Sequence, residues 1–201
     1  SRVLDAVNQV LRESLRCDTR EEVARTCLKV AEELTDSRFG FIGELNQAGL
    51  FDTTAISNPG WDACSMPDSD ATKLITDMPI RGVALSMLRE EKSRIVNDPV
   101  SHPDHVTLPE GHPQITAFLG VPLKREGKTV GMIGLANKES GYTLADQENV
   151  ESLGGAFVEA LNHQRTAEAL RKGEERYRLM VERLPIGITH NTPAGEFLVY
   201  N

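Results

Sequence analysis

The most regular pattern of hydrophobic and polar positions lies in residues 118–136. Aliphatic side chains occupy every second position of 119–123, and a second alternation runs through 130–136. A period of two residues is typical of a β-strand. The polar sequence KREGK between the two segments contains Gly127, which can adopt the positive φ of a tight turn. Residues 118–136 are therefore predicted to form a β-hairpin.

The rest of the pattern predicts further strands and helices around this hairpin. Alternation predicts a second hairpin over residues 39–57, with its turn at 46–49, and a short strand at 93–96. Apolar residues spaced three or four apart predict helices at residues 2–16, about 18–35, 82–91 and about 144–184. The order of these elements predicts an α+β fold with an antiparallel sheet flanked by helices.

Three segments of the chain resemble the core of a GAF domain. They are FLGVPL at 118–123, GMIGLANK at 131–138 and YTLADQE at 142–148. The resemblance extends over about residues 20–165. It implies a GAF-like antiparallel sheet flanked by helices, with a long C-terminal helix, and a role as a sensory module of bacterial signalling proteins.

The resemblance also divides the chain into parts. We expect an N-terminal amphipathic helix at residues 1–17 and a GAF sensory domain at residues 18–163. A signalling helix or linker should follow at residues 164–184, and the start of a truncated PAS domain at residues 185–201. The last assignment rests on the sequence YRLMVERLPIGITHNTPAGEFLVYN, which resembles the entry of a PAS domain, with strands expected at 185–188 and 197–200. Such a chain would be a piece of a longer multidomain sensor. We expect a sensor histidine kinase, with a diguanylate cyclase or another output domain as the next candidate.

Composition narrows the class of protein. The net charge of −8 argues against a nucleic-acid-binding surface, because phosphate contacts require clustered Lys and Arg. No run approaches the roughly 18 apolar residues of a membrane span. The three cysteines, an odd number without CxxC spacing, indicate reduced thiols and a cytoplasmic location.

Residues 97–114 form the least regular segment. The prolines at positions 99, 103, 109 and 113 exclude a regular helix or a central strand. An irregular segment of this length is typical of a lid or a mobile loop, and in GAF domains the corresponding region borders the ligand pocket. We therefore expect a pocket for an unidentified small molecule, and any cofactor stays unknown. The residues expected near this pocket are Phe41, Asn58, Trp61, Cys64, Met66, His112, Phe118 and Asn137.

A group of polar residues after the predicted hairpin has two interpretations. Asn137, Lys138, Tyr142 and Asp146 resemble the Asn-Lys-Phe-Asp-Glu signature of GAF domains that bind cyclic nucleotides, but Tyr replaces Phe and Gln147 replaces Glu. The simpler interpretation is a structural lock, in which Lys138 pairs with Asp146 and ties the last strand to the following helix. We favour the lock and keep cyclic-nucleotide binding as an alternative.

Histidines and one cysteine are the candidates for metal or redox chemistry. His102 and His105 have acceptable spacing for metal ligands, and Asp104 could add an oxygen. The prolines around them favour local hydrogen bonds instead, so we expect no metal site. Cys64, beside Trp61, is a candidate ligand-contacting or redox-sensing thiol, although no base or resolving cysteine is near it in sequence.

The sequence contains no motif of nucleophilic, phosphate-binding or zinc-dependent catalysis. It lacks a GxSxG elbow, a GxxxxGK[ST] loop and an HExxH helix. A methionine-sulfoxide reductase of GAF type would need several cooperating cysteines, and the spread of Cys17, Cys27 and Cys64 does not match. We therefore expect a non-catalytic domain in which a bound ligand favours one of two helix arrangements. A ligand-free dimerisation spacer is the alternative, favoured if large hydrophobic side chains fill the sheet face.

Apolar stripes on the first and last helices predict a dimer. His163, Leu170, Tyr177 and Leu184 repeat every seven residues, which is a weak heptad pattern. We expect a parallel homodimer about a two-fold axis, which would carry the signal towards the downstream domains. The expected interface residues are Val7, Leu11, Leu15, Leu161, Leu170 and Tyr177.

Overall fold

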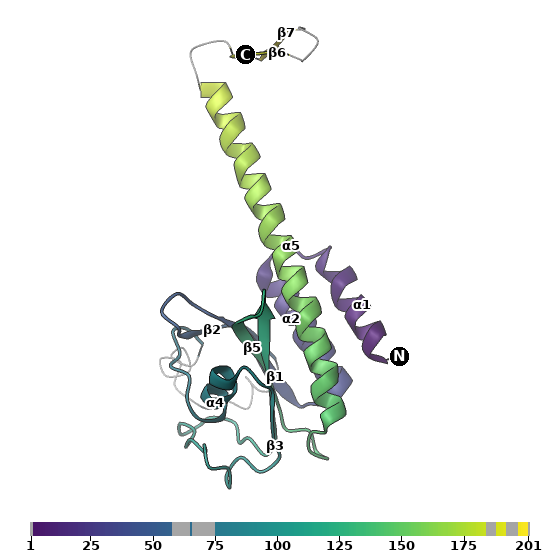
Figure 1. Ribbon diagram of the computed structural model, residues 1–201, viewed down its shortest axis with the longest axis vertical. Coiled ribbons are helices and arrows are strands. Elements are labelled where there is room, and N and C mark those ends of the chain that lie inside the picture. The colour runs from purple at the N-terminus through teal and green to yellow at the C-terminus, as the bar shows by residue number, and fades with distance from the viewer. Residues whose placement is uncertain (1, 58–64, 66–74, 184–187, 192–196, 201) are drawn as a thin grey trace. The chain divides into compact units, whose positions relative to one another are not determined.

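The structure is a computed structural model of the 201-residue chain (Figure 1). It describes residues 2–57, 65, 75–183, 188–191 and 197–200. The chain forms two compact units, which comprise residues 1–161 and 162–201. The candidate site lies in the first unit.

The first unit is built around a five-stranded antiparallel sheet with the strand order β2-β1-β5-β4-β3. Both hairpins that the alternation predicts are present, and the α+β fold is confirmed. The edge strand β3 pairs with β4. The strands are β1 (Phe39–Leu45), β2 (Phe51–Ile56), β3 (Arg94–Val96), β4 (Phe118–Arg125) and β5 (Lys128–Ala136).

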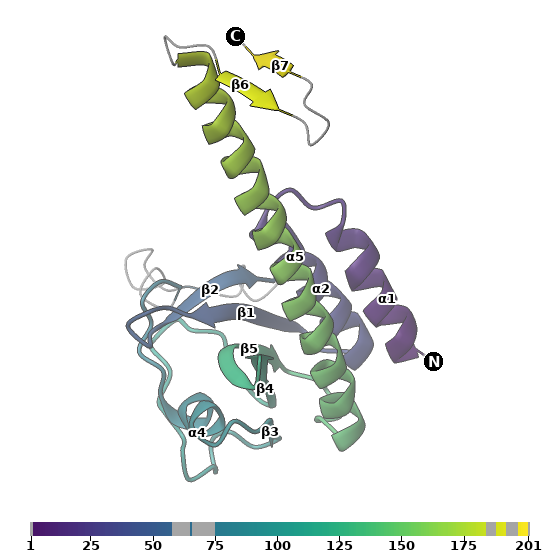
Figure 2. The same ribbon diagram turned by 45° about the horizontal axis from the view of Figure 1, so that its top comes forward.

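Helices cover both faces of this sheet. The described helices are α1 (Arg2–Ser14), α2 (Arg20–Thr35), α4 (Gly82–Glu90) and α5 (Leu144–Arg183). In the first unit, α1, α2 and the N-terminal part of α5 lie on one side, and α4 lies on the other (Figures 1 and 2). The sheet therefore separates a helical face, which packs against α1, α2 and α5, from the face towards α4.

Local sequence fixes where α2 and α5 of the helical face begin. Thr19 caps α2 through a capping box, because its hydroxyl accepts from the backbone N–H of Glu22 and the Glu22 carboxylate accepts from the backbone N–H of Thr19. Thr143 and Asp146 make the same reciprocal arrangement at the start of α5. These side chains satisfy N–H groups that the first turn of a helix leaves without partners.

The main hydrophobic core lies between the sheet and the helical face. Leu119, Val121 and Leu123 of β4 are buried against residues of α2 and α5, as their alternation predicts. Gly154 allows α5 to lie close to the sheet, because a Cβ at this position would be 3.2 Å from Cδ2 of Leu123. Each fully buried aliphatic side chain contributes about 1.5–3 kcal/mol. The larger of the two clusters of buried hydrophobic side chains therefore lies on the helical face.

In the second unit, β6 (Ile188–Asn191) pairs antiparallel with β7 (Phe197–Tyr200). The predicted strand at 197–200 is present. Of the strand predicted at 185–188, only Ile188 is described, and it is the first residue of β6. Residues 185–187 lie outside the described residues.

Candidate functional site

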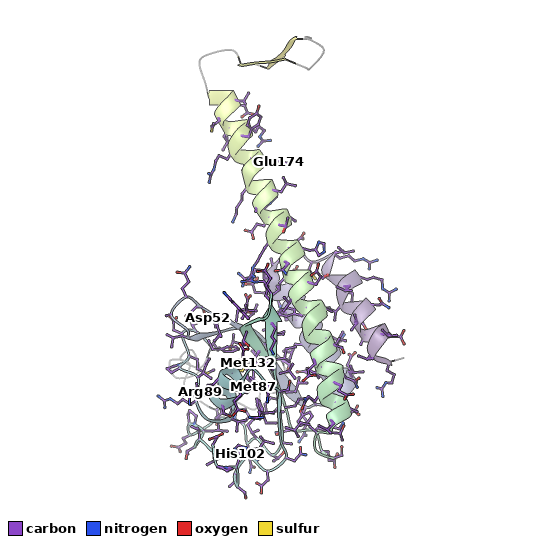
Figure 3. The ribbon with its side chains drawn as sticks, viewed as in Figure 1. Asp52, Met87, Arg89, His102, Met132 and Glu174 are labelled. Atoms are coloured by element: carbon purple, nitrogen blue, oxygen red, sulfur yellow. The ribbon has the colours of Figure 1, made fainter. Side chains whose placement is uncertain are left out.

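The face of the sheet towards α4 carries the candidate site. Phe51, Met87 and Met132 are completely buried between the sheet, its edge and α4. Figure 3 shows Met87 of α4 beside Met132 of β5. The partly buried side chains that pack against them are Phe41, Leu45, Met78, Ile80, Ala84 and Leu88. The described part of this face is therefore packed with large hydrophobic side chains of the chain itself.

Aromatic rings lie directly on glycines of this face. A Cβ on Gly134 would come within 2.4 Å of the Phe41 ring, and a Cβ on Gly120 would come within 2.9 Å of the Phe118 ring. Gly120 and Gly134 are cross-strand partners in β4 and β5. They make a flat patch of backbone without side chains, which we call the glycine floor. The Phe41 ring also meets the Phe51 ring edge to face, with 5.8 Å between the ring centroids.

Of the residues predicted near a pocket, Phe41 and Phe118 lie on this face and are partly exposed. Asn58, Trp61, Cys64 and Met66 lie outside the described residues. His112 and Asn137 lie in connecting segments and make hydrogen bonds within the chain. The His112 ring donates from Nδ1 to the backbone oxygen of Pro113 over 2.8 Å.

The Asn137 side chain is used by the protein itself. Its Oδ1 accepts from the backbone N–H and the hydroxyl of Thr116, over 2.8 and 3.2 Å, and its Nδ2 donates to the backbone oxygen of Gln114 over 2.8 Å. Asn137 has a positive φ of 62°, which asparagine tolerates better than most residues. The amide therefore ties the end of the irregular segment to the end of β5.

A second asparagine ties the other end of that segment. The backbone N–H of Tyr142 donates to Oδ1 of Asn97 over 2.7 Å, and Nδ2 of Asn97 donates to the backbone oxygen of Tyr142 over 3.0 Å. Sequence reasoning missed Asn97. Its only signal was an asparagine directly after a strand, where such side chains often replace a backbone partner.

Lys138 and Asp146 complete this region. The Lys138 ammonium donates to both carboxylate oxygens of Asp146 over 2.8 Å, and the two side chains are only 15% and 8% exposed. Burial alone would raise the pKa of Asp146, but Lys138 and the donors of Thr143 outweigh it, so the pKa lies below its ordinary value. The pair joins the end of β5 to the first turn of α5.

Tyr142 connects the same region to α2. Its hydroxyl shares a 2.8 Å hydrogen bond with the Ser37 hydroxyl, which in turn bonds to Thr35 at the end of α2. Burial raises the pKa of Tyr142 to about 12, so the hydroxyl stays protonated at neutral pH. We call residues 137–146 the junction, because they bond to both ends of the irregular segment, to the end of α2 and to the start of α5.

One carboxyl group near the end of β2 has an unusual environment. Oε1 of Glu32 is buried and has no hydrogen-bond partner. Burial raises the pKa of Glu32 to about 7, against a smaller lowering by the Ser57 hydroxyl. Ser57 Oγ in turn accepts from the backbone N–H of Gly40 over 2.9 Å. The charge of Glu32 therefore changes near neutral pH.

The structure describes no metal centre: within its described ranges, no three His, Cys, Asp or Glu side chains come together as metal ligands. Nδ1 of His102 accepts from the backbone N–H of Asp104, and Nδ1 of His105 donates to the backbone oxygen of Pro99. Cys27 is completely buried in the main core, and burial raises the pKa of its thiol to about 12. A thiol with such a pKa is a poor nucleophile at neutral pH.

The residues expected at a dimer interface differ in exposure. Val7 and Leu11 are partly buried against the core of their own unit, and Leu161 is 3% exposed inside that core. Leu15, Leu170 and Tyr177 are 79%, 64% and 59% exposed. Leu15, Leu170 and Tyr177 are therefore accessible on the surface of the chain, whereas Leu161 belongs to its core.

The comparisons with known proteins concern the fold and its family. A family model described as GAF domain matches residues 17–162. The GAF domain of a phosphoenolpyruvate-protein phosphotransferase from Coxiella burnetii is similar with a TM-score of 0.68 at 16% identity, over 84% of this chain and 97% of that chain. Residues 122 to 287 of a methyl-accepting chemotaxis protein are similar with a TM-score of 0.59 at 13% identity, over 80% and 99%.

An enzyme has the same fold. The free methionine-R-sulfoxide reductase of Neisseria meningitidis is similar with a TM-score of 0.63 at 15% identity, over 82% of this chain and 91% of that chain. At these identities the likeness shows the fold alone. Among the described residues, no helix is long and apolar enough to cross a membrane.

Proposed function

The chain belongs to the GAF domain family, and from this premise we propose that it is a non-catalytic sensory domain of a bacterial signalling protein. In this proposal a small molecule binds on the α4 side of the sheet. Its binding changes the junction and thereby α5, which passes the signal to a PAS domain and a histidine kinase output. We propose a cytoplasmic location because the chain has three cysteines, an odd number, without CxxC spacing.

The observation that carries this proposal is the bonding of the junction. Asn97 and Asn137 attach both ends of the irregular segment to it, and the Lys138–Asp146 pair attaches it to the first turn of α5. A ligand that repositions the irregular segment would therefore act on α5 through a few hydrogen bonds and one buried ion pair. A ligand can shift such a balance only by its difference in affinity for the two arrangements.

Cyclic-nucleotide binding finds less support. Three residues of the signature that suggests it, Asn137, Lys138 and Asp146, already bond to protein groups. A nucleotide phosphate would have to break the buried Lys138–Asp146 pair, and breaking such a pair is strongly destabilising. We therefore propose that these residues stabilise the fold and do not contact the ligand.

A ligand-free spacer is the second candidate. The observation that favours it is the complete burial of Phe51, Met87 and Met132 on the face where a ligand would bind. In that case the domain would only hold two copies together and set the distance between neighbouring domains. Both candidates include a parallel homodimer, which we propose on the exposed apolar residues of α1 and α5.

Hydrogen exchange followed by mass spectrometry separates the two candidates. The full chain is incubated with a panel of metabolites that includes cyclic nucleotides, and exchange is followed in the irregular segment and in α5. A sensory domain should show slower exchange in both segments with the same compound. Binding without a change in α5 contradicts the relay, and an absence of binding across the panel favours the spacer.

A further inference from the structure

The chemistry of the glycine floor indicates which class of molecule this face can hold. The side chains nearest to the floor are Phe41 over Gly134, with Phe118 and Met87 over Gly120. All three are uncharged, and two are flat rings. They occupy the space that a Cβ would need, so each is in close contact with bare backbone.

Two polar residues expected near the pocket, Asn137 and His112, and Lys138 of the predicted lock bond within the chain. Asn137 is bonded to residues 114 and 116, His112 to Pro113, and Lys138 to Asp146. None of these side chains offers a free charge to a ligand. Burying a charged group against apolar side chains without a partner costs far more than burying a ring. The described residues of this face therefore favour an uncharged ligand.

We propose that the ligand is an uncharged, planar, ring-containing molecule that binds on the glycine floor by replacing the ring of Phe41 or Phe118. This inference rests on the proposed sensory function and names its ligand class. In the structure the two rings occupy the floor themselves. A planar ligand would make the same contact with the backbone of Gly134 and Gly120, and would gain a sulfur–aromatic contact with Met87.

The same geometry explains how binding could reach the rest of the domain. A ligand can bind on the floor only after the Phe41 or Phe118 side chain has rotated away. The apparent affinity is therefore the intrinsic affinity multiplied by the fraction of molecules in which the floor is uncovered. Phe118 is the first residue of β4 and directly follows Ala117, whose backbone oxygen accepts from the backbone N–H of Asn137 over 2.9 Å. Movement of this ring therefore acts close to the junction.

The test uses indole as an uncharged planar probe and adenosine monophosphate as a charged one. Binding to the full chain is measured by isothermal titration calorimetry and by saturation-transfer NMR. We expect indole to bind at one site and adenosine monophosphate not to bind. Gly134→Ala places a methyl group where the Phe41 ring lies, and should weaken indole binding by about tenfold or more.

Gly155→Ala is the matched control, because a Cβ at Gly155 meets no atom within 4 Å. It should leave indole binding unchanged. Should Gly134→Ala fail to fold, as judged by circular dichroism, Gly120→Ala is the second variant. Its Cβ would meet the Met87 sulfur and the Phe118 ring, which are ends of flexible side chains.

The outcomes distinguish the planar-ligand inference from the sensory function. No indole binding, or indole binding that neither glycine variant weakens, overturns the planar-ligand inference. A charged metabolite that binds and slows exchange in α5 also overturns it, but supports the sensory function. Indole that binds at the floor without any change of exchange in α5 supports the ligand class and contradicts the sensory function.

Discussion

At the scale of single residues, Glu32 combines a position in the fold with an effect of pH. Its Oε1 is buried without a hydrogen-bond partner, and its pKa is raised from an ordinary value of 4.5 to about 7. The folded chain therefore holds this proton more tightly than the unfolded chain. Between about pH 4.5 and 7 the contribution of Glu32 to stability falls as pH rises. Above that window the ionised Glu32 lowers the free energy of unfolding by a constant amount.

Glu32→Gln should remove this pH dependence. The variant should be more stable than the parent at pH 8, and the difference should shrink towards pH 5, because the parent is then protonated in the folded state. Chemical denaturation at several pH values measures it. Glu33→Gln, on the same helix, is the control: the Glu33 charge makes only a minor contribution to the raised pKa of Glu32, so this variant should keep most of the pH dependence of the parent. A parent stability curve that Glu32→Gln leaves unchanged between pH 5 and 8 contradicts the prediction.

Asn97 illustrates a residue whose role depends on a partner far away in sequence. Its amide makes two hydrogen bonds with the backbone of Tyr142. Asn97→Ala should lower the free energy of unfolding by about 2 kcal/mol, because each bond contributes about 1 kcal/mol. It should also raise hydrogen exchange across residues 98–116 and in the first turn of α5. Asn97→Asp keeps the acceptor for the Tyr142 N–H but places a carboxylate oxygen against the Tyr142 backbone oxygen, so it should also destabilise the fold. Equal exchange in the parent and in Asn97→Ala would falsify the role of the junction.

At the scale of elements, the Lys138–Asp146 pair joins a strand to a helix. Asp146→Asn leaves a mostly buried ammonium without its counter-charge and should cost about 3 kcal/mol. Lys138→Met combined with Asp146→Asn removes both charges, keeps an acceptor for the Thr143 N–H at the start of α5, and should recover much of that loss. Thermal and chemical unfolding of Asp146→Asn, Lys138→Met and the double variant give the coupling energy. A double variant less stable than either single variant contradicts this account.

Sequence reasoning was accurate for elements and weak for the contacts between them. The hairpins followed from a period of two, and the start of α5 from the local Thr143–Asp146 pair. Alternation also placed Phe118 on the face opposite Leu119. Each of these features depends on residues close together in sequence.

Contacts between distant residues left no such signal. Asn97 and Tyr142 are 45 positions apart, and the side-chain amide of Asn97 makes hydrogen bonds with the backbone N–H and oxygen of Tyr142. Asn137 was expected near the pocket, and its hydrogen-bond partners are groups of residues 114–117, which alternation in the sequence does not reveal. The burial of Glu32 depends on how α2 lies against β1 and β2, which the helical period alone does not specify.

At the scale of the whole molecule, the proposed assembly depends on apolar residues that one chain leaves in contact with water. Leu170 and Tyr177 are seven positions apart on α5 and are more than half exposed. A heptad spacing places both on the seam of a parallel pair of helices. Lys172, close to Leu170, pairs with Glu168 of the same helix. We therefore expect the apolar side chains of Leu170 and Tyr177 to make the contact with a second copy.

Leu170→Glu should convert the dimer to a monomer. Two carboxylates would face each other in an apolar seam, at a cost on the order of a few kcal/mol. Light scattering at micromolar concentration should show a dimer for the parent and a monomer for the variant, with unchanged circular dichroism of the first unit. Leu179→Glu is the matched control, since Leu179 is exposed on the same helix but lies two positions after Tyr177, off the seam. A monomeric parent, or a control that dissociates as readily as Leu170→Glu, would show that this stripe is not where two copies meet.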